Sequence, residues 1–304
     1  MTDPFPPPGA NMAEPRRMLA VIGALVTVAI WANFMVTSGG MVGAGLGVVE
    51  LGLMRAGVCA LALAPVIRRI GLYPKGLAPG RFAVMLLGAG FSFLYLLPAG
   101  YLFASPASSG AFAPGLLPLW VAILSMIFLG EKIGARRGFG FALILLGVFA
   151  VGGWDAIANA ADGAWKGYLM FASSSFFFAC YAVAQRGSGL DAVQATALLS
   201  FWLVPIAGAV ALVRGVDFGV VSPGALAWTA LAMLFSGVVA IITYTYAVMQ
   251  LGPSRASAFM ALTPAAVALG SDIFLDQPAS ALVWAGIAVV SAGVLIASGV
   301  LERR

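Results

Sequence analysis

Few residues of this chain could do chemistry, and the charged ones among them stand inside long apolar runs. Glu50, Arg55 and Asp272 are the three charges at depth. If the runs cross a membrane, a charge there is costly and marks a functional site by default. Glu50 and Asp272 are therefore the candidates for coupling to protons. The alternative is that both acids sit at the membrane interface, or pair with Arg55 for structural reasons.

The patterns that a membrane enzyme would need are missing. The chain has no HExxH zinc motif, no paired aspartate motif for a diphosphate on magnesium, no Walker A sequence and no histidine. Gly270-Ser271-Asp272 is not a GxGD motif. We therefore expect no enzyme, no cofactor and no metal site, and no direct use of ATP.

The elements that must position these residues follow from composition. Of 304 residues, 62% are hydrophobic and only 9% are charged, whereas a soluble domain has about 25% charged residues. The solvent of most side chains must be lipid, and a span needs about 20 apolar residues. The sequence predicts an all-α membrane protein with ten transmembrane helices: 17–38, 48–67, 82–104, 108–129, 137–153, 165–185, 193–213, 224–250, 256–275 and 279–301.

The basic residues set the orientation of these spans. With the N-terminus in the cytoplasm, thirteen Lys or Arg residues fall inside and only Lys166 and Arg214 fall outside. The thirteen are Arg16, Arg17, Arg68, Arg69, Lys75, Arg81, Lys132, Arg136, Arg137, Arg186, Arg255, Arg303 and Arg304. This strong positive-inside bias predicts a multi-pass protein with both termini cytoplasmic. It is no nucleic-acid footprint, because no basic face interleaved with exposed aromatics lies outside the membrane.

Two smaller features complete the organisation. The Pro-rich segment 1–16 is expected to be a disordered cytoplasmic N-terminus, and the first span is expected to be retained rather than cleaved as a signal peptide. Cys59 and Cys180 both lie inside spans. They are expected to be small packing residues; the alternative is a disulfide.

The chain nearly repeats itself after 146 positions. "FLGEK" (128–132) returns as "FLDQP" (274–278), and Pro118 falls on Pro264. "WANF" (31–34) returns as "FACY" (178–181) at a shift of 147. Each half, 17–153 and 154–304, holds five spans, so the second half crosses the membrane in the opposite sense. Two inverted five-helix repeats are typical of secondary transporters, with a site near the midplane. A structural or receptor membrane protein would explain ten spans but not this repeat.

At these residues the chain resembles EamA-type members of the drug/metabolite transporter superfamily. The resemblance covers about 17–301 and rests on "YLFASPASSGAFAPGLLPL" (101–119) before "FLGEK" and on "YAVMQLGPSRASAFMALTP" (246–264) before "FLDQP". Asp276-Gln277-Pro278 departs from the usual ending, which Gly130-Glu131-Lys132 keeps. Within the superfamily, the chain looks most like the aromatic amino acid exporters of bacterial inner membranes.

The resemblance implies that helices one, three, four, six, eight and nine surround a central cavity. On these helices aromatic rings and polar groups predominate, and we take them as candidate substrate-binding residues: Trp31, Asn33, Phe34, Tyr95, Tyr101, Phe112, Tyr181, Tyr244 and Phe259. Four prolines are candidates for kinks or gating: Pro98, Pro114, Pro118 and Pro264. Gly140 and Gly147, repeated as Gly286 and Gly293, are expected to be packing faces between helices.

The candidate cavity residues favour a zwitterion. Rings suit an aromatic side chain and its ammonium group, while hydroxyls and Asn33 suit a carboxylate. We expect export of aromatic and other neutral amino acids from the cytoplasm by alternating access, down the substrate gradient or with weak proton coupling. The alternative is a multidrug exporter of lipophilic or cationic compounds. The expected partners are the amino acid substrate and membrane lipid but no nucleic acid, and a monomer is compatible with the sequence.

Overall fold

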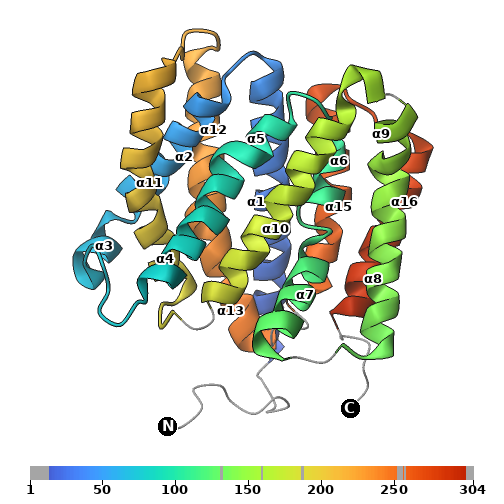
Figure 1. Cartoon of the computed structure of the whole chain (residues 1–304), viewed down its shortest axis with the longest axis horizontal. Coiled ribbons are helices and arrows are strands. Elements are labelled where there is room, and N and C mark those ends of the chain that lie inside the picture. Colours follow the sequence, from blue (N-terminus) through green and yellow to red (C-terminus); the bar gives the residue numbers. More distant parts are fainter. Residues whose placement is uncertain are drawn as a thin grey trace.

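The computed structural model of the chain describes residues 14–130, 133–158, 160–185, 188–251, 256 and 258–298. Within these residues every regular element is a helix, and no strand occurs. The helices stand side by side in one bundle (Figure 1). The all-α prediction is confirmed for this part of the chain. Residues 1–13, and from the charge count Lys132, Arg186, Arg255, Arg303 and Arg304, lie outside the described residues.

The first half of the chain forms α1 (Glu14–Gly43), α2 (Val48–Ala62), α3 (Ala64–Ile70), α4 (Pro79–Met85), η1 (Leu86–Leu96), α5 (Leu97–Gly100), α6 (Pro106–Phe112), α7 (Leu117–Leu129), α8 (Ala135–Val148) and η2 (Phe149–Gly153). The second half forms α9 (Trp154–Ala158), η3 (Ala160–Asp162), α10 (Ala164–Gln185), α11 (Ala192–Arg214), α12 (Pro223–Leu234), η4 (Phe235–Val239), α13 (Ala240–Leu251), η5 (Met260–Leu262), α15 (Thr263–Leu275) and α16 (Ala281–Ala297).

Seven helices of the described part are long and apolar enough to cross a membrane: Pro15–Gly43, Pro79–Gly100, Pro106–Phe128, Ala135–Gly153, Ala164–Gln185, Ala192–Arg214 and Pro223–Leu251. The pair α2 and α3, bent by 65°, would make an eighth span. Met260–Leu275 and Ala281–Ala297 are apolar but shorter. Each predicted span overlaps a helix, but the count of ten spans stays a prediction.

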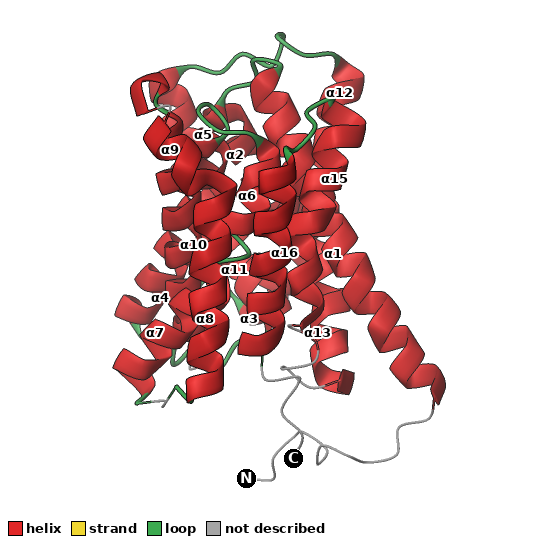
Figure 2. Ribbon diagram, turned by 90° about the vertical axis from the view of Figure 1, so that its right-hand side faces the viewer, coloured by secondary structure: helices red, strands yellow, loops and turns green. Residues whose placement is uncertain are grey.

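The bundle has two ends, and its loops gather at them (Figure 2). We call the end with α9 the α9 end and the opposite end the α3 end. The start of α10, with Lys166, and the end of α11, with Arg214, lie at the α9 end, while α3, with Arg68 and Arg69, and the start of α8 lie at the α3 end (Figures 1 and 2). The charge count thus predicts that the α3 end faces the cytoplasm.

Helix starts follow directly from the sequence. Pro79, Pro106 and Pro223 each stand in the first turn of a helix. Proline is tolerated there because the amide donor that it lacks would have no intrahelical partner. Before Pro223, the Ser222 hydroxyl accepts the backbone N–H of Ala225 at 3.2 Å, which caps α12.

Glycines let α8 and α16 pack closely in antiparallel directions. A Cβ on Gly147 would lie 2.6 Å from the carbonyl oxygen of Gly286, and one on Gly293 would lie 2.7 Å from that of Gly140. Neither distance leaves room for a methyl group, so these positions need glycine. The prediction that these four glycines form packing faces is confirmed, and the faces pack against each other.

The first helix of each half packs against the third and fourth spans of the other half. α1 lies against α13 and α15, and α10 lies against η1 and α7. The second spans also meet, because α11 packs along α2. The halves therefore interlock through several pairs of helices rather than meeting at a single flat interface.

The near-repeat at "FLGEK" and "FLDQP" corresponds to a pair of matching helices. α7 and α15 both have 13 residues, and the residues before them have almost the same backbone, with φ −79° and ψ −15° at Leu116 and φ −80° and ψ −16° at Leu262. Both helices end in a left-handed residue, Gly130 with φ 67° and Asp276 with φ 50°. In the second copy this left-handed position is occupied by Asp276, although glycine adopts the conformation with less strain.

The fourth span breaks at its prolines. α6 ends at Phe112, and α7 begins at Leu117, so Pro114 lies in the turn between them. The amide of Gly115 bonds the carbonyl oxygen of Gly110 at 3.1 Å across this turn. Pro118 and Pro264 occupy the first turns of α7 and α15. The α-helix is thus interrupted at this turn, whereas a kink of the span and a gating role stay predictions.

Candidate functional site

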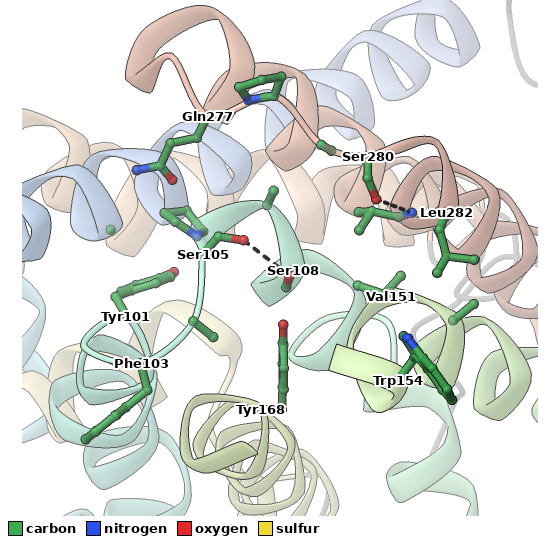
Figure 3. Close-up of a pocket in the computed structure, with 18 of the residues that line it drawn as sticks. Tyr101, Phe103, Ser105, Ser108, Val151, Trp154, Tyr168, Gln277, Ser280 and Leu282 are labelled. Carbon is green, nitrogen blue, oxygen red and sulfur yellow. Dashed lines mark hydrogen bonds between the residues drawn. The ribbon is translucent and has the colours of Figure 1, made fainter. Parts of the chain in front are cut away.

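A cavity of about 660 Å³ lies at the α9 end of the bundle, and we call it the α9-end pocket. Its lining comes from α1, α6, η2, α9, α10 and the loop before α16, together with the 101–105 segment. The side chains that give it character are Tyr101, Phe103, Ser105, Ser108, Trp154, Tyr168, Gln277 and Ser280 (Figure 3). Among the described residues that line it, none has a charged side chain.

Rings and hydroxyls meet in this pocket. The ring of Tyr168 stacks on that of Phe112, with centroids 4.9 Å apart and planes at 24°. Its hydroxyl points toward the hydroxyls of Ser105 and Ser108, which lie 3.2 Å apart (Figure 3). Tyr101 is buried, and its hydroxyl donates to Ser109 Oγ at 3.4 Å. Such a lining suits a neutral or zwitterionic molecule with an aromatic part.

Two glycines let the walls of the pocket close on these rings. A Cβ on Gly152 would lie 2.6 Å from the Tyr168 ring and 2.9 Å from the Phe112 ring, so η2 approaches the stacked pair through a bare backbone. A Cβ on Gly39 of α1 would collide with Pro106 at the start of α6. Local sequence thus sets how tightly α1, α6 and η2 surround the pocket.

A second group of functional side chains lies deeper in the bundle, and we call it the Arg55 cluster: Trp31, Phe34, Arg55, Ser236 and Tyr244. The guanidinium carbon of Arg55 lies 4.4 Å from the centroid of the Phe34 ring. The same guanidinium donates to Ser236 Oγ at 3.0 Å. The indole N–H of Trp31 donates to the carbonyl oxygen of Ser236 at 3.4 Å, and the Trp31 and Tyr244 rings lie 5.9 Å apart.

The local fold explains how this cluster forms. Ser236 sits in η4, a π-helical stretch that interrupts the eighth span, and π-turns of this kind occur often at functional sites. α1 and α2 bring Trp31, Phe34 and Arg55 to the same place. Phe34 is buried, but Trp31, Arg55 and Tyr244 remain partly exposed. The guanidinium and the two rings therefore lie beside one another and are only partly covered by protein atoms.

The structure distributes the other predicted substrate residues over several places. Tyr101 lines the α9-end pocket, and Phe112 packs beneath it. Tyr181 lies 5.2 Å from Phe178 on its own helix. Phe259 lines a separate apolar cavity of about 370 Å³ at the α3 end.

Asn33 and Tyr95 are the remaining predicted substrate residues. Asn33 is partly exposed on α1. Tyr95 lies beside Phe91, with ring centroids 6.0 Å apart. Among the described residues, its buried hydroxyl has no hydrogen-bond partner, and the same holds for Trp120 Nε1 and Thr263 Oγ1. Buried polar groups are nearly always paired, so water or a ligand is the expected partner of each.

The two acids predicted to couple protons lie in different surroundings. Glu50 is buried near the start of α2, and its carboxylate accepts the backbone N–H of Asp217 at 2.7 Å, which fixes the loop before α12. Arg55 is five positions further along α2, so the two side chains leave different faces of the helix. Asp272 is exposed on α15. The described residues contain no group of acidic or cysteine side chains that could hold a metal ion.

Sequence reasoning missed several of these residues. Tyr168 and Trp154 line the α9-end pocket but lie near the ends of their helices, where an interfacial aromatic is common. Ser236 could have been found: Pro79-Gly80 and Phe91-Ser92 return as Pro223-Gly224 and Phe235-Ser236, 144 positions later. Both Phe-Ser pairs lie in the π-helical stretches η1 and η4.

Comparisons with known proteins agree with this arrangement. Residues 165–299 match the model of the EamA-like transporter family. The chain is 27% identical over 223 residues to "Uncharacterized transporter YyaM" of Bacillus subtilis (strain 168). The aligned residues make up 70% of this chain and 70% of that protein. A solved structure described only as the crystal structure of a protein is similar with a TM-score of 0.60 and 20% identity, over 91% of this chain and 95% of that one. At that identity the likeness supports the fold alone.

The fold and these likenesses define the class of protein. Seven apolar helices of spanning length in the described residues make the chain a multi-pass membrane protein. Its second half is similar to the EamA-like transporter family.

Proposed function

We propose that the protein is a secondary transporter built from two inverted five-helix repeats, 17–153 and 154–304. In this proposal it exports aromatic and other neutral amino acids from the cytoplasm by alternating access. Similarity of residues 165–299 to a transporter family supports the class, and so does similarity to a protein named as a transporter. The substrate and the mechanism are argued from the residues.

One observation carries the mechanism: similar hydrogen bonds, made at third-span positions that are not repeat partners, join equivalent helices of the two halves. Thr27 Oγ1 on α1 lies 3.3 Å from the carbonyl oxygen of Ala240 and 2.8 Å from Thr243 Oγ1. Ser174 Oγ on α10, 147 positions after Thr27, lies 3.4 Å from the carbonyl oxygen of Ser92 and 2.9 Å from Ser92 Oγ. In each half a buried hydroxyl of the first helix bonds the third span of the other half.

This symmetry supports alternating access for a physical reason. Two halves of like build and opposite direction can exchange conformations, so that a state open on one side has a counterpart open on the other. The reciprocal glycine contacts of α8 with α16 follow the same exchange, since Gly140 meets Gly293 and Gly147 meets Gly286. Gly140 thus contacts the repeat partner of Gly147, and Gly147 contacts the repeat partner of Gly140.

The substrate class rests on the linings of the two sites. The α9-end pocket offers rings and hydroxyls without charge, and the Arg55 cluster offers two rings beside a cation. A zwitterion with an aromatic side chain can use both. A lipophilic cation would find rings but no acid in either set of residues. Passage down the substrate gradient, or weak proton coupling through Glu50 or Asp272, completes the proposal.

Counterflow tests this function. Liposomes that hold the pure protein and unlabelled phenylalanine should accumulate labelled phenylalanine from outside, and protein-free liposomes should not. The same assay with labelled tetraphenylphosphonium tests the multidrug alternative. Accumulation of the cation without any amino acid would contradict the proposal.

A further inference from the structure

We propose that the apolar cavity at the α3 end binds a phospholipid with an anionic headgroup, its phosphate against Arg17 and one acyl chain inside the cavity. We call this cavity the Arg17 groove. The proposal goes beyond transport, because it does not depend on which molecule the protein carries.

The lining of the Arg17 groove joins one basic side chain to an apolar bed. The groove has a volume of about 370 Å³. Apart from Arg17, the described residues that line it are all apolar: Val21, Leu251, Ala258, Phe259, Leu262 and Leu295. A small polar molecule needs several placed polar groups to fix its orientation, and this lining offers one. An acyl chain with an anion at its end needs no more.

The groove forms where the first helix stands away from the last. α1 packs against α13 and meets η5, and η5 packs against α16. Figure 2 shows the start of α1 leaning away from α16 at the α3 end. Two lining residues, Leu262 and Leu295, are 47% and 38% exposed. In a membrane such exposed apolar side chains contact lipid, so an acyl chain can reach the groove from the bilayer.

The order of the lining along α1 matches the order of groups in a phospholipid. Arg17 is the fourth residue of α1, and Val21 lies one turn, about 6 Å, further along the helix. The apolar span Pro15–Gly43 begins two residues before Arg17. Arg17 therefore stands where the headgroup layer meets the hydrocarbon, and the apolar lining begins one turn deeper.

The charge around the groove favours an anionic headgroup. Arg16 and Arg17 are both exposed in the first turns of α1, which also contain Glu14, so the net charge there is positive. Arg137 of α8 donates to the carbonyl oxygen of Ala297, at the end of α16, at 3.2 Å. A guanidinium matches the geometry of a phosphate, and basic residues at the membrane surface attract anionic lipids.

Native mass spectrometry of the purified full-length protein tests the headgroup with two lipids of identical acyl chains. The wild type should retain dioleoyl-phosphatidylglycerol about fivefold more strongly than dioleoyl-phosphatidylcholine, as expected for one arginine at the membrane surface. Arg17→Gln should reduce phosphatidylglycerol to the level of phosphatidylcholine. Arg16→Gln is the matched control and should keep the preference, because Arg16 is exposed but is not among the lining residues.

A second pair of variants tests the acyl chain. Leu295→Trp fills the groove from α16 and should lose the retained phosphatidylglycerol even though Arg17 is intact. Leu146→Trp changes an exposed leucine of α8 that is not among the lining residues, and should change nothing. Size-exclusion profile and thermal unfolding verify that each variant is folded.

Three results would each overturn the proposal: equal retention of both lipids by the wild type, equal losses for Arg16→Gln and Arg17→Gln, or full retention by Leu295→Trp. Equal losses for the two arginine variants would mean that the lipid adheres to a basic surface rather than to the groove. Counterflow of phenylalanine tests the proposed function separately, so either proposal can fail without the other.

Discussion

α1 and α10, the first helices of the two halves, are held in the same way but stand beside different chemistry. Thr27 on α1 and Ser174 on α10 each bond a carbonyl oxygen and a hydroxyl of the opposite third span, although at positions that are not repeat partners. Beside α1, however, α2 brings Arg55, whereas α11 has no basic residue before Arg214 in its last turn. What the halves share is the scaffold; what only one half has is the charge. The difference suggests that the function is built from the unrepeated residues.

The largest effect is expected from breaking the shared scaffold at α8 and α16. Gly147→Ala would put a methyl group 2.6 Å from the Gly286 carbonyl oxygen and should lower the free energy of unfolding by about 1–3 kcal/mol. Thermal unfolding in detergent measures it. The matched control is Gly138→Ala on the same helix, where no atom lies within 4 Å. That change should be neutral or stabilise by about 0.5–1 kcal/mol. Equal unfolding temperatures for both variants would contradict the packing account.

The second-largest effect is expected in the Arg55 cluster, whose basic residue has no counterpart in the other half. Trp31→Ala or Tyr244→Ala removes one ring from the Arg55 cluster, where each ring contact is worth about 0.5–1.5 kcal/mol beyond the buried area. Phenylalanine should then bind roughly two- to tenfold more weakly. Trp284→Ala removes a ring that packs on the core from α16 and should lower stability without changing affinity. Equal loss of affinity for Trp284→Ala would mean that the rings of the cluster hold no substrate.

The smallest effect compares the matching helix ends. Asp276 is in the left-handed region with φ 50°, where its counterpart is Gly130 with φ 67°. Asp276→Gly should stabilise the protein by about 0.5–1 kcal/mol, because glycine adopts this conformation without strain. Gly130→Ala should destabilise it by a similar amount. Unfolding measurements in which Asp276→Gly is destabilising would show that the aspartate side chain contributes something that its backbone geometry does not reveal.

Sequence reasoning predicted the scaffold better than the site. Hydropathy, proline starts and the repeat of "FLGEK" as "FLDQP" indicated the helices and the matched ends of α7 and α15, because backbone geometry is coded locally. The site depends on which helices meet and at what depth. Arg55 and Ser236 are 181 residues apart, and no local pattern joins them. Tyr168 and Trp154 lie near helix ends, where aromatic residues are common, and only the packing of α9 and α10 brings them to one pocket.

The most direct test of the central claim, two halves of opposite direction, is the sidedness of two equivalent loops. Lys75 precedes Pro79 of the third span, and Ser222 precedes Pro223 of the eighth. In a background with Cys59→Ser and Cys180→Ser, a cysteine replaces either residue and is labelled with a membrane-impermeant maleimide. The account predicts that Ser222→Cys reacts in intact cells and Lys75→Cys only after lysis. Labelling of both positions from the same side would contradict the inverted repeat.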